Sequence, residues 1–203
     1  DNNFTYLITC SRTGTHAIVD AATDTNEITH YLRSEPVAIL ITHGHGDHTA
    51  FLDKYVQQYP GATILGHPDS KLKEKYSNFK KVDNNQEFII GEMRFKCIHT
   101  PGHYFDSICY QISPVLFTGD TMFVGRTGRI KGKYSSIEDL YDSIYNKILK
   151  IPGSIKIYPG HDYGDKPNIT LMENILNSPL LSANTLDEFK KRMDDYEKNR
   201  KIG

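Results

Sequence analysis

An apolar run at residues 37–41 leads directly into a short segment that carries four possible metal ligands. The run is continuous rather than alternating, which is typical of a strand that is buried on both faces. The side chains that follow it are His43, His45, Asp47 and His48, and the glycines between them let the chain turn sharply. Imidazole and carboxylate groups are the donors that zinc and iron take. The chain therefore predicts a buried strand that ends at a metal site.

The first third of the chain alternates between strand and helix patterns. The predicted elements are strands at 4–10 and 16–20, a helix at 25–33, the buried strand at 37–41, a helix at 49–59 and a strand at 62–65. Gly14 lies in the turn between the first two strands, which predicts a hairpin. Asp24 and Glu27 are placed to cap the first helix, and Pro36 ends it.

The middle of the chain changes character. Short strand patterns at 87–90, 93–99, 107–112 and 115–118 are separated by Gly, Pro or Asp, and they predict an antiparallel meander. A capping box at Ser135 and Glu138 then opens a helix with one apolar stripe. The stripe consists of Ile137, Leu140, Ile144, Ile148 and Ile151. One more strand is predicted at 155–158.

Two further capping boxes, Thr170 with Glu173 and Thr185 with Glu188, predict helices near the end of the chain. Strands in both βαβ and meander order, with helices throughout, favour an α+β fold of two packed β-sheets with helices on both outer faces. No Pro/Gly/Ser linker divides the chain. We therefore predict one domain over residues 1–203, of which about 168–203 form a short helical extension.

Charge and composition exclude several functions. The chain has 24 Lys and Arg against 25 Asp and Glu, so it lacks the excess of positive charge that binds nucleic acid over a broad surface. No apolar run approaches the roughly 20 residues of a membrane helix, and no leader peptide is visible. We expect a cytoplasmic protein, although the chain begins with Asp1 rather than Met, so an organellar leader stays open. The three cysteines, Cys10, Cys97 and Cys109, lie in apolar surroundings and are expected to be buried thiols.

Three more metal-capable side chains lie at the ends of predicted strands. They are His103, Asp120 and His161, and each directly follows a glycine. A single His or Asp in such a place is usually an ordinary loop residue. Three with the same strand, glycine and ligand order indicate that they converge on the 43–48 segment.

The joint pattern of His43-x-His45-x-Asp47-His48, Pro-Gly-His103, Thr-Gly-Asp120 and Gly-His161 resembles the metallo-β-lactamase superfamily over about residues 2–163. The resemblance implies the αβ/βα sandwich of that family, with the site at one edge. It also implies a ligand set for two metal ions. His43, His45 and His103 would hold the first ion, Asp47, His48 and His161 the second, and Asp120 would bridge them.

Such a site predicts hydrolysis by a metal-bound hydroxide. Two divalent ions, expected to be zinc or a mixture of zinc, iron and manganese, lower the pKa of a shared water and polarise the substrate oxygen. Asp47 and Asp120 are the side chains to which we assign catalytic roles on this basis. A structural metal is a weaker interpretation, because a closed structural site needs four ligands rather than seven.

Within the superfamily the chain is most similar to hydroxyacylglutathione hydrolases, the glyoxalase II group. The opening residues 1–7 and the stretch 116–124 carry this likeness. Arg129 stands where that group has a basic residue that contacts the glutathione carboxylate, and an Arg suits a carboxylate through its bidentate fork. The substrate implied is a small thiol conjugate, and the reaction implied is thioester hydrolysis. Asp120, where common metallo-β-lactamases have Cys, argues against an antibiotic hydrolase.

A second branch stays open. The Gly-His161-Asp162-Tyr163 sequence and the short tail are similar to persulfide dioxygenases, which act on glutathione persulfide. This resemblance implies one Fe²⁺ held by His43, His103 and Asp120, with open positions for oxygen. The oligomeric state stays open as well.

Four aromatic residues near the motifs could form pocket walls or core, namely Phe51, Tyr104, Phe105 and Phe123. His99 precedes the Pro-Gly-His103 motif, and we expect it to pair with the backbone rather than to act in catalysis.

Overall fold

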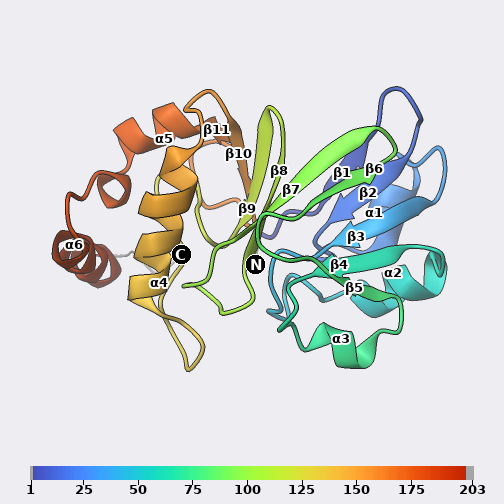
Figure 1. The fold of residues 1–203 in the computed structure, drawn as a ribbon, viewed down its shortest axis with the longest axis horizontal. Coiled ribbons are helices and arrows are strands. Elements are labelled where there is room, and N and C mark those ends of the chain that lie inside the picture. The colour runs from blue at the N-terminus through green and yellow to red at the C-terminus, as the bar shows by residue number, and fades with distance from the viewer. Residues whose placement is uncertain (1, 200–203) are drawn as a thin grey trace.

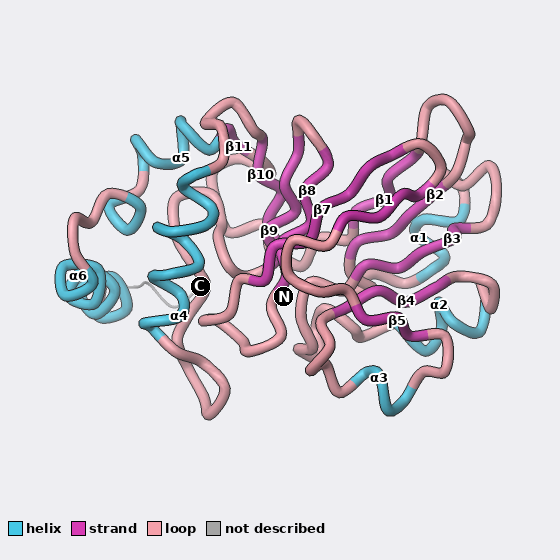
Figure 2. The backbone as a smooth tube through the Cα atoms, in the orientation of Figure 1, coloured by secondary structure: helices cyan, strands magenta, loops and turns pink. Residues whose placement is uncertain are grey.

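Two β-sheets pack face to face, and helices cover the outer face of each sheet (Figure 1). The computed structural model describes residues 2–199, and the coloured tube in Figure 2 shows the strands of both sheets between two groups of helices. This is the predicted α+β sandwich of two packed sheets with helices on both outer faces, so the predicted fold class is confirmed. Among the described residues no helix combines the length and the apolar character needed to span a bilayer.

The first sheet has the strand order β1-β2-β3-β4-β5. Its strands are β1 (Tyr6–Thr9), β2 (His16–Val19), β3 (Pro36–Leu40), β4 (Thr63–Gly66) and β5 (Phe79–Lys81). β1 and β2 form the predicted antiparallel hairpin, and the other neighbours are parallel. The accompanying helices are α1 (Thr25–Thr29), α2 (Leu52–Gln58) and α3 (Leu72–Lys75).

The second sheet has the strand order β11-β10-β9-β8-β7-β6. Its strands are β6 (Glu87–Ile90), β7 (Met93–His99), β8 (Ile108–Ile112), β9 (Val115–Gly119), β10 (Lys156–Pro159) and β11 (Ile169–Thr170). Strands β6 to β9 are antiparallel neighbours, which confirms the predicted meander, whereas β9 and β10 are parallel. The helical elements are α4 (Ile137–Tyr141), η1 (Asp142–Lys147), η2 (Ile148–Lys150), α5 (Leu171–Asn177), η3 (Pro179–Leu181) and α6 (Leu186–Lys198).

The apolar run of β3 divides its side chains between two cores. Ala38 and Leu40 belong to the cluster between the sheets, whereas Ile39 and Ile41 belong to the cluster under α2. Side chains of a strand point alternately to its two faces, so a strand covered on both sides is apolar at every position. Burial on both faces therefore explains the run from Ala38 to Ile41, whereas Val37 at its start is 46% exposed.

The helical stripe covers the other outer face. Leu140, Ile144 and Ile148 are fully buried in one cluster with Leu116 of β9 and Ile157 of β10. The segment is helical from 137 to 150 as predicted, but it passes through α-, π- and 3₁₀-geometry in turn.

The end of the chain packs on the same cluster. Phe189 and Met193 of α6 are buried there, and Thr170 and Thr185 cap α5 and α6 as predicted. The extension predicted at 168–203 therefore covers the second sheet as far as it is described, and residues 200–203 lie outside the described part. That residues 1–203 form a single domain stays a prediction.

A few local predictions were wrong. The cap of α4 is Ser136 rather than Ser135, and its side chain accepts from the amide of Asp139. The sequence patterns also missed α3, β5 and β11. α3 buries no residue, β5 is an edge strand with two exposed lysines, and β11 has two residues, so none carries a periodic apolar signal.

Candidate metal centre

The seven predicted ligands all lie at one edge of the sandwich, each close behind the end of a strand. The segment 43–48 follows β3, His103 follows β7, Asp120 follows β9 directly, and His161 follows β10. Strand ends are where layered α/β folds gather functional groups, because the loops that leave them meet at one edge. The structure brings the seven side chains into three overlapping groups, whose possible ligand atoms lie within 4.8 Å of one another.

The first group consists of His43, His45 and His103. His45 Nδ1 lies 3.0 Å from His43 Nε2 and 3.1 Å from His103 Nε2. Three imidazole nitrogens thus face one point, which is the three-ligand geometry of a catalytic metal site.

The second group consists of Asp47, His48 and His161. His161 Nε2 lies 3.3 Å from His48 Nε2 and 3.3 Å from Asp47 Oδ2. Asn3 donates a hydrogen bond of 2.9 Å from its side-chain amide to the same Asp47 oxygen. The second group is therefore mixed, with two nitrogen donors and one oxygen donor.

Asp120 lies between the two groups. Its Oδ2 is 3.5 Å from His103 Nε2 and 3.3 Å from His161 Nε2, and its Oδ1 is 3.2 Å from His48 Nε2. Oδ1 is buried, and among the described residues no donor meets hydrogen-bond geometry to it. A buried carboxylate oxygen in this condition is costly unless a cation or a water satisfies it.

The hydrogen bonds of His43 and His103 orient the inner nitrogens of these two rings toward the centre. The Thr42 hydroxyl donates to Asp20, so it accepts from His43 Nδ1, and His103 Nδ1 donates to the carbonyl of Arg129 at 2.9 Å. Nε2 of both rings then presents a lone pair to the centre. The donor set and its orientation fit divalent metal ions.

The electrostatics favour positive charge at the centre. Burial opposes ionisation of Asp120, but the neighbouring His161 and His48 rings outweigh it and hold the pKa of this carboxyl well below its usual range. Burial, with the nearby charge of His48, holds the pKa of His43 well below its usual range, so this imidazole stays neutral. A neutral imidazole and an ionised carboxylate are the forms in which these groups bind metals.

Asp20 supports the site, and the sequence interpretation missed it. Its carboxylate accepts from the Thr42 amide at 2.8 Å and from the Thr42 hydroxyl at 2.8 Å, and it lies 2.8 Å from His48 Nδ1. Asp20 is 2% exposed and has a φ of 57°. The sequence did contain a signal for Asp20, because a charged residue directly after an apolar, buried strand needs a partner for its charge.

Two glycines let the backbone approach the centre. A Cβ at Gly160 would overlap Asp120 Oδ1 and would lie 2.6 Å from His48 Cε1. Gly119 has a φ of +48°, and a Cβ there would lie 2.7 Å from the Thr42 side chain. A side chain at either position would displace a predicted ligand or its support.

A pocket of about 280 Å³ opens on the centre. Besides five of the predicted ligands, its lining comprises Phe123, Arg126, Thr127, Arg129 and Tyr163. Arg129, the predicted substrate-binding residue, is therefore at the pocket, where its side chain is exposed.

The four aromatic candidates have different places. Phe123 lines the pocket, and the Tyr104 ring lies 4.2 Å from the His45 ring. Phe105 packs on Tyr104 at 4.7 Å, while Phe51 packs in the core under α2. His99 pairs with the backbone as predicted, since its Nε2 is 2.9 Å from the carbonyl of Phe105.

The fold and the arrangement of side chains define a class of protein. Residues 1–161 match the family model described as the metallo-beta-lactamase superfamily, and the chain belongs to this superfamily.

Individual relatives refine the likeness. The chain is 32% identical over 181 residues to a probable polyketide biosynthesis zinc-dependent hydrolase, BaeB, of Bacillus velezensis, with 87% of this chain and 80% of that protein covered. It is 38% identical over 131 residues to a hydroxyacylglutathione hydrolase of Francisella tularensis subsp. novicida, with 62% of this chain and 49% of that protein covered. The chain thus spans about half the length of the latter relative.

Among solved structures, the fold is similar to that of ETHE1 from Myxococcus xanthus. The TM-score is 0.85 at 25% identity, with 99% of this chain and 88% of that chain covered. The hydroxyacylglutathione hydrolase and ETHE1 relatives support the predicted branch of the superfamily.

Proposed function

We propose that this protein is a two-metal thioester hydrolase that acts on small thiol conjugates of the hydroxyacylglutathione type. The observation that carries the proposal is the convergence of seven donors in three overlapping groups, with the buried Asp120 carboxylate close to both His103 and His161. The likeness to a hydroxyacylglutathione hydrolase and to a probable zinc-dependent hydrolase supports hydrolytic chemistry.

The ligand assignment follows the three groups of donors. His43, His45 and His103 would hold one ion and Asp47, His48 and His161 the other, while Asp120 would contact both. Zinc fits this mixture of nitrogen and oxygen donors, and so do iron and manganese. When bound, two such ions supply a deprotonated water at neutral pH and polarise the substrate carbonyl.

The protein's own groups hold this arrangement in place. Asp20 fixes the ring of His48 through Nδ1, and the Arg129 carbonyl fixes the ring of His103. The hydrogen bond from His161, aided by that from Asn3 and opposed by burial, lowers the pKa of Asp47 below its usual range. Asp47 therefore stays a carboxylate at the pocket, in the form that can accept hydrogen bonds and bind a metal ion.

Arg129 is our candidate for binding the substrate carboxylate. It lines the pocket, and among the described residues no acidic side chain forms an ion pair with it. A guanidinium without an acidic partner beside the reaction centre can take a carboxylate through two parallel hydrogen bonds.

The test compares two substrates on one preparation of the protein. We expect release of free thiol from S-lactoylglutathione and little turnover of the β-lactam nitrocefin, and we expect elemental analysis to find two metal ions per chain. Strong nitrocefin turnover with an inert thioester would reverse the assignment.

A second function has an observation in its favour. The likeness to ETHE1 over 99% of this chain supports a persulfide dioxygenase with one Fe²⁺, held by His43, His103 and Asp120. One iron per chain, with oxygen uptake in the presence of glutathione persulfide and no thioester hydrolysis, would favour this alternative.

A further inference from the structure

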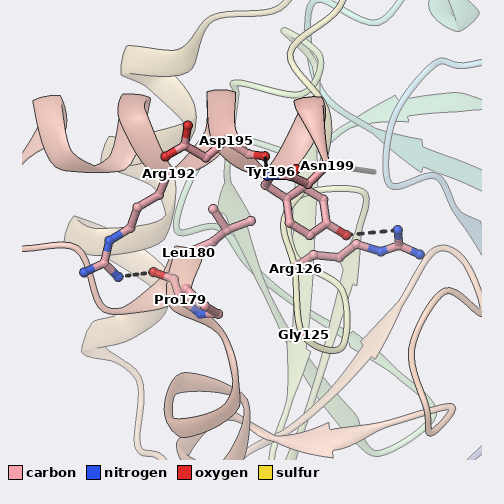
Figure 3. Close-up of a pocket in the computed structure, with 8 residues that line it drawn as sticks. All are labelled: Gly125, Arg126, Pro179, Leu180, Arg192, Asp195, Tyr196 and Asn199. Atoms are coloured by element: carbon pink, nitrogen blue, oxygen red, sulfur yellow. Dashed lines mark hydrogen bonds between the residues drawn. The ribbon is translucent and has the colours of Figure 1, made fainter. Parts of the chain in front are cut away.

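Arg126 forms part of the wall between the metal pocket and a second pocket. The second pocket, which we call the α6 pocket, has a volume of about 540 Å³ and lies between α6, η3 and the loop after β9 (Figure 3). Arg126 is common to the linings of both pockets. Arg126 is neither a predicted metal ligand nor a predicted substrate-binding residue, so its place between the two pockets has to be explained by its other contacts.

The guanidinium of Arg126 is held by two tyrosines. Its Nη1 donates to the hydroxyl of Tyr196 on α6 at 3.2 Å, the contact drawn in Figure 3, and its Nη2 donates to the carbonyl of Tyr163 at 2.9 Å. Its Cζ lies 4.3 Å from the centre of the Tyr163 ring. Among residues 2–199 no carboxylate forms an ion pair with this group, so the aromatic face and the two oxygens hold the charge.

The Tyr163 ring in turn supports the ring of His161. The two rings are stacked, with centres 4.6 Å apart and planes only 3° from parallel. Phe123 closes the side of this stack, 5.9 Å from His161 and 5.3 Å from Tyr163. A continuous series of contacts therefore runs from α6 through Arg126 and Tyr163 to a proposed metal ligand.

We propose that Arg126 is a positioning residue for the second metal ion, which it serves by holding Tyr163 flat against His161, and that Tyr196 makes this support depend on α6. The proposal rests on the two-ion function stated above. Asn3 pairs with the backbone of His161, and its side-chain amide lies 3.5 Å from His161 Nε2. The stacked Tyr163 ring adds a restraint on the side-chain torsions of the imidazole, and it thereby helps to direct Nε2 toward Asp47 and Asp120.

The size of the expected change in metal affinity follows from what is general for metal sites in proteins. Groups that orient a metal-binding imidazole typically change metal affinity by about 10–100-fold when they are removed. His43, His45 and His103, which would hold the first ion, make no hydrogen bond or ring contact with Tyr196, Arg126 or Tyr163, so the affinity for this ion should not change.

The experiment titrates metal-free protein with Co²⁺ and follows the absorption of each equivalent bound. For Arg126→Ala we expect the first equivalent to bind as in the parent and the second to bind about 10–100-fold more weakly. Arg126→Lys keeps a cation near the Tyr163 ring and one donor, so it should recover part of the loss. Tyr196→Phe removes one acceptor and should cause a smaller loss.

Arg192→Ala is the matched control. Arg192 lines the same α6 pocket and bonds to the Ser182 hydroxyl at 2.8 Å, but it does not touch Tyr163. Thermal unfolding of each metal-free variant shows whether it is folded. We expect Arg192→Ala to lose stability without weakening the second equivalent.

Two results would overturn the proposal while leaving the function intact. One is parent-like binding of both equivalents by Arg126→Ala, and the other is an equal weakening in Arg192→Ala. If Arg126→Ala does not fold, Tyr163→Leu decides instead, since it removes the stacked ring and should weaken the second equivalent to the same extent. A single equivalent in the parent would contradict the two-metal function itself, and with it this inference.

Discussion

At the scale of single residues, Asp120 has the largest predicted role. It is the carboxylate that reaches donors of both groups, and one of its oxygens is buried without a hydrogen bond among the described residues. Each histidine contributes one nitrogen. His45, His103 and His161 belong to one group each, whereas His43 and His48 belong to two groups each. Loss of Asp120 should therefore affect both ions, whereas loss of a histidine should affect mainly one.

For Asp120→Ala we expect a fall in thioesterase activity of at least about 10²-fold, because the variant loses a group that positions the whole centre. Elemental analysis should find fewer metal ions per chain than in the parent. Asp162→Ala is a suitable control, since it removes an exposed carboxylate next to His161 that is outside the donor groups. Full activity in Asp120→Ala would remove this residue from the mechanism.

His161→Ala separates the two functions. A two-metal hydrolase should lose its second ion and most of its turnover, because His161 belongs to the second group only. A dioxygenase with one iron held by His43, His103 and Asp120 should keep its iron and much of its oxygen uptake. Oxygen consumption that survives in His161→Ala, together with retained iron and no thioesterase activity in the parent, would decide against hydrolysis.

At the scale of elements, the site depends on how closely neighbouring strand ends approach. β9 and β10 run parallel, and Gly160 directly after β10 has no side chain to separate His161 from Asp120. The strands thus determine where the loops start, and the glycine determines how closely the loops with Asp120 and His161 can approach each other.

For Gly160→Ala we expect loss of bound metal and a loss of activity of at least about 10-fold, because the added methyl group would overlap Asp120 Oδ1 and the His48 ring. Gly61→Ala is the control, since a Cβ there meets nothing within 4 Å. Metal content and activity measured on both variants decide the point. A fully loaded, active Gly160→Ala would mean that the site can shift to make room.

At the scale of the whole molecule, the two sheets are joined by a stacked pair of histidine rings as well as by the core. His67, which follows β4 of the first sheet, stacks on His99 of β7 in the second sheet, with ring centres 4.0 Å apart. Burial, aided by the charge of His99, lowers the pKa of His67 to about 4. The folded chain therefore favours the neutral form of His67, in which its ring stacks on His99.

The stability of the protein should depend on pH through this contact. The unfolded chain takes up a proton at His67 near pH 6.5, whereas the folded chain resists it down to about pH 4, so the contribution is complete above pH 6.5 and is lost as the pH falls toward 4. Urea unfolding at pH 7 and pH 5 measures it. In His67→Asn, whose side-chain oxygen can still accept from the Asp69 amide, the decrease in unfolding free energy between these pH values should be smaller. An equal decrease in both proteins would exclude His67 as its source.

Removal of the metal ions should also change the stability of the whole molecule. Ions that bind the folded chain only should stabilise it, by about 2.7 kcal/mol at a concentration 100 times the dissociation constant. We expect a chelator to lower the melting temperature and added Zn²⁺ to restore it. In Asp120→Ala the chelator should have a smaller effect, and an equal effect in the two proteins would place the responsible metal elsewhere.

The sequence by itself determined the sandwich and the meander, and it predicted the seven ligands, because each leaves a local signal. The buried run of β3 shows as continuous apolar residues, and the strand-ending glycines precede His103, Asp120 and His161. Only the tertiary structure decided which groups surround the ligands. Asp20, Arg126 and Tyr196 act on the site through contacts between segments far apart in the chain, such as the 3.2 Å bond between Arg126 and Tyr196. A local pattern cannot encode such contacts, since they depend on how sheets and helices pack, and the packing follows from the whole chain.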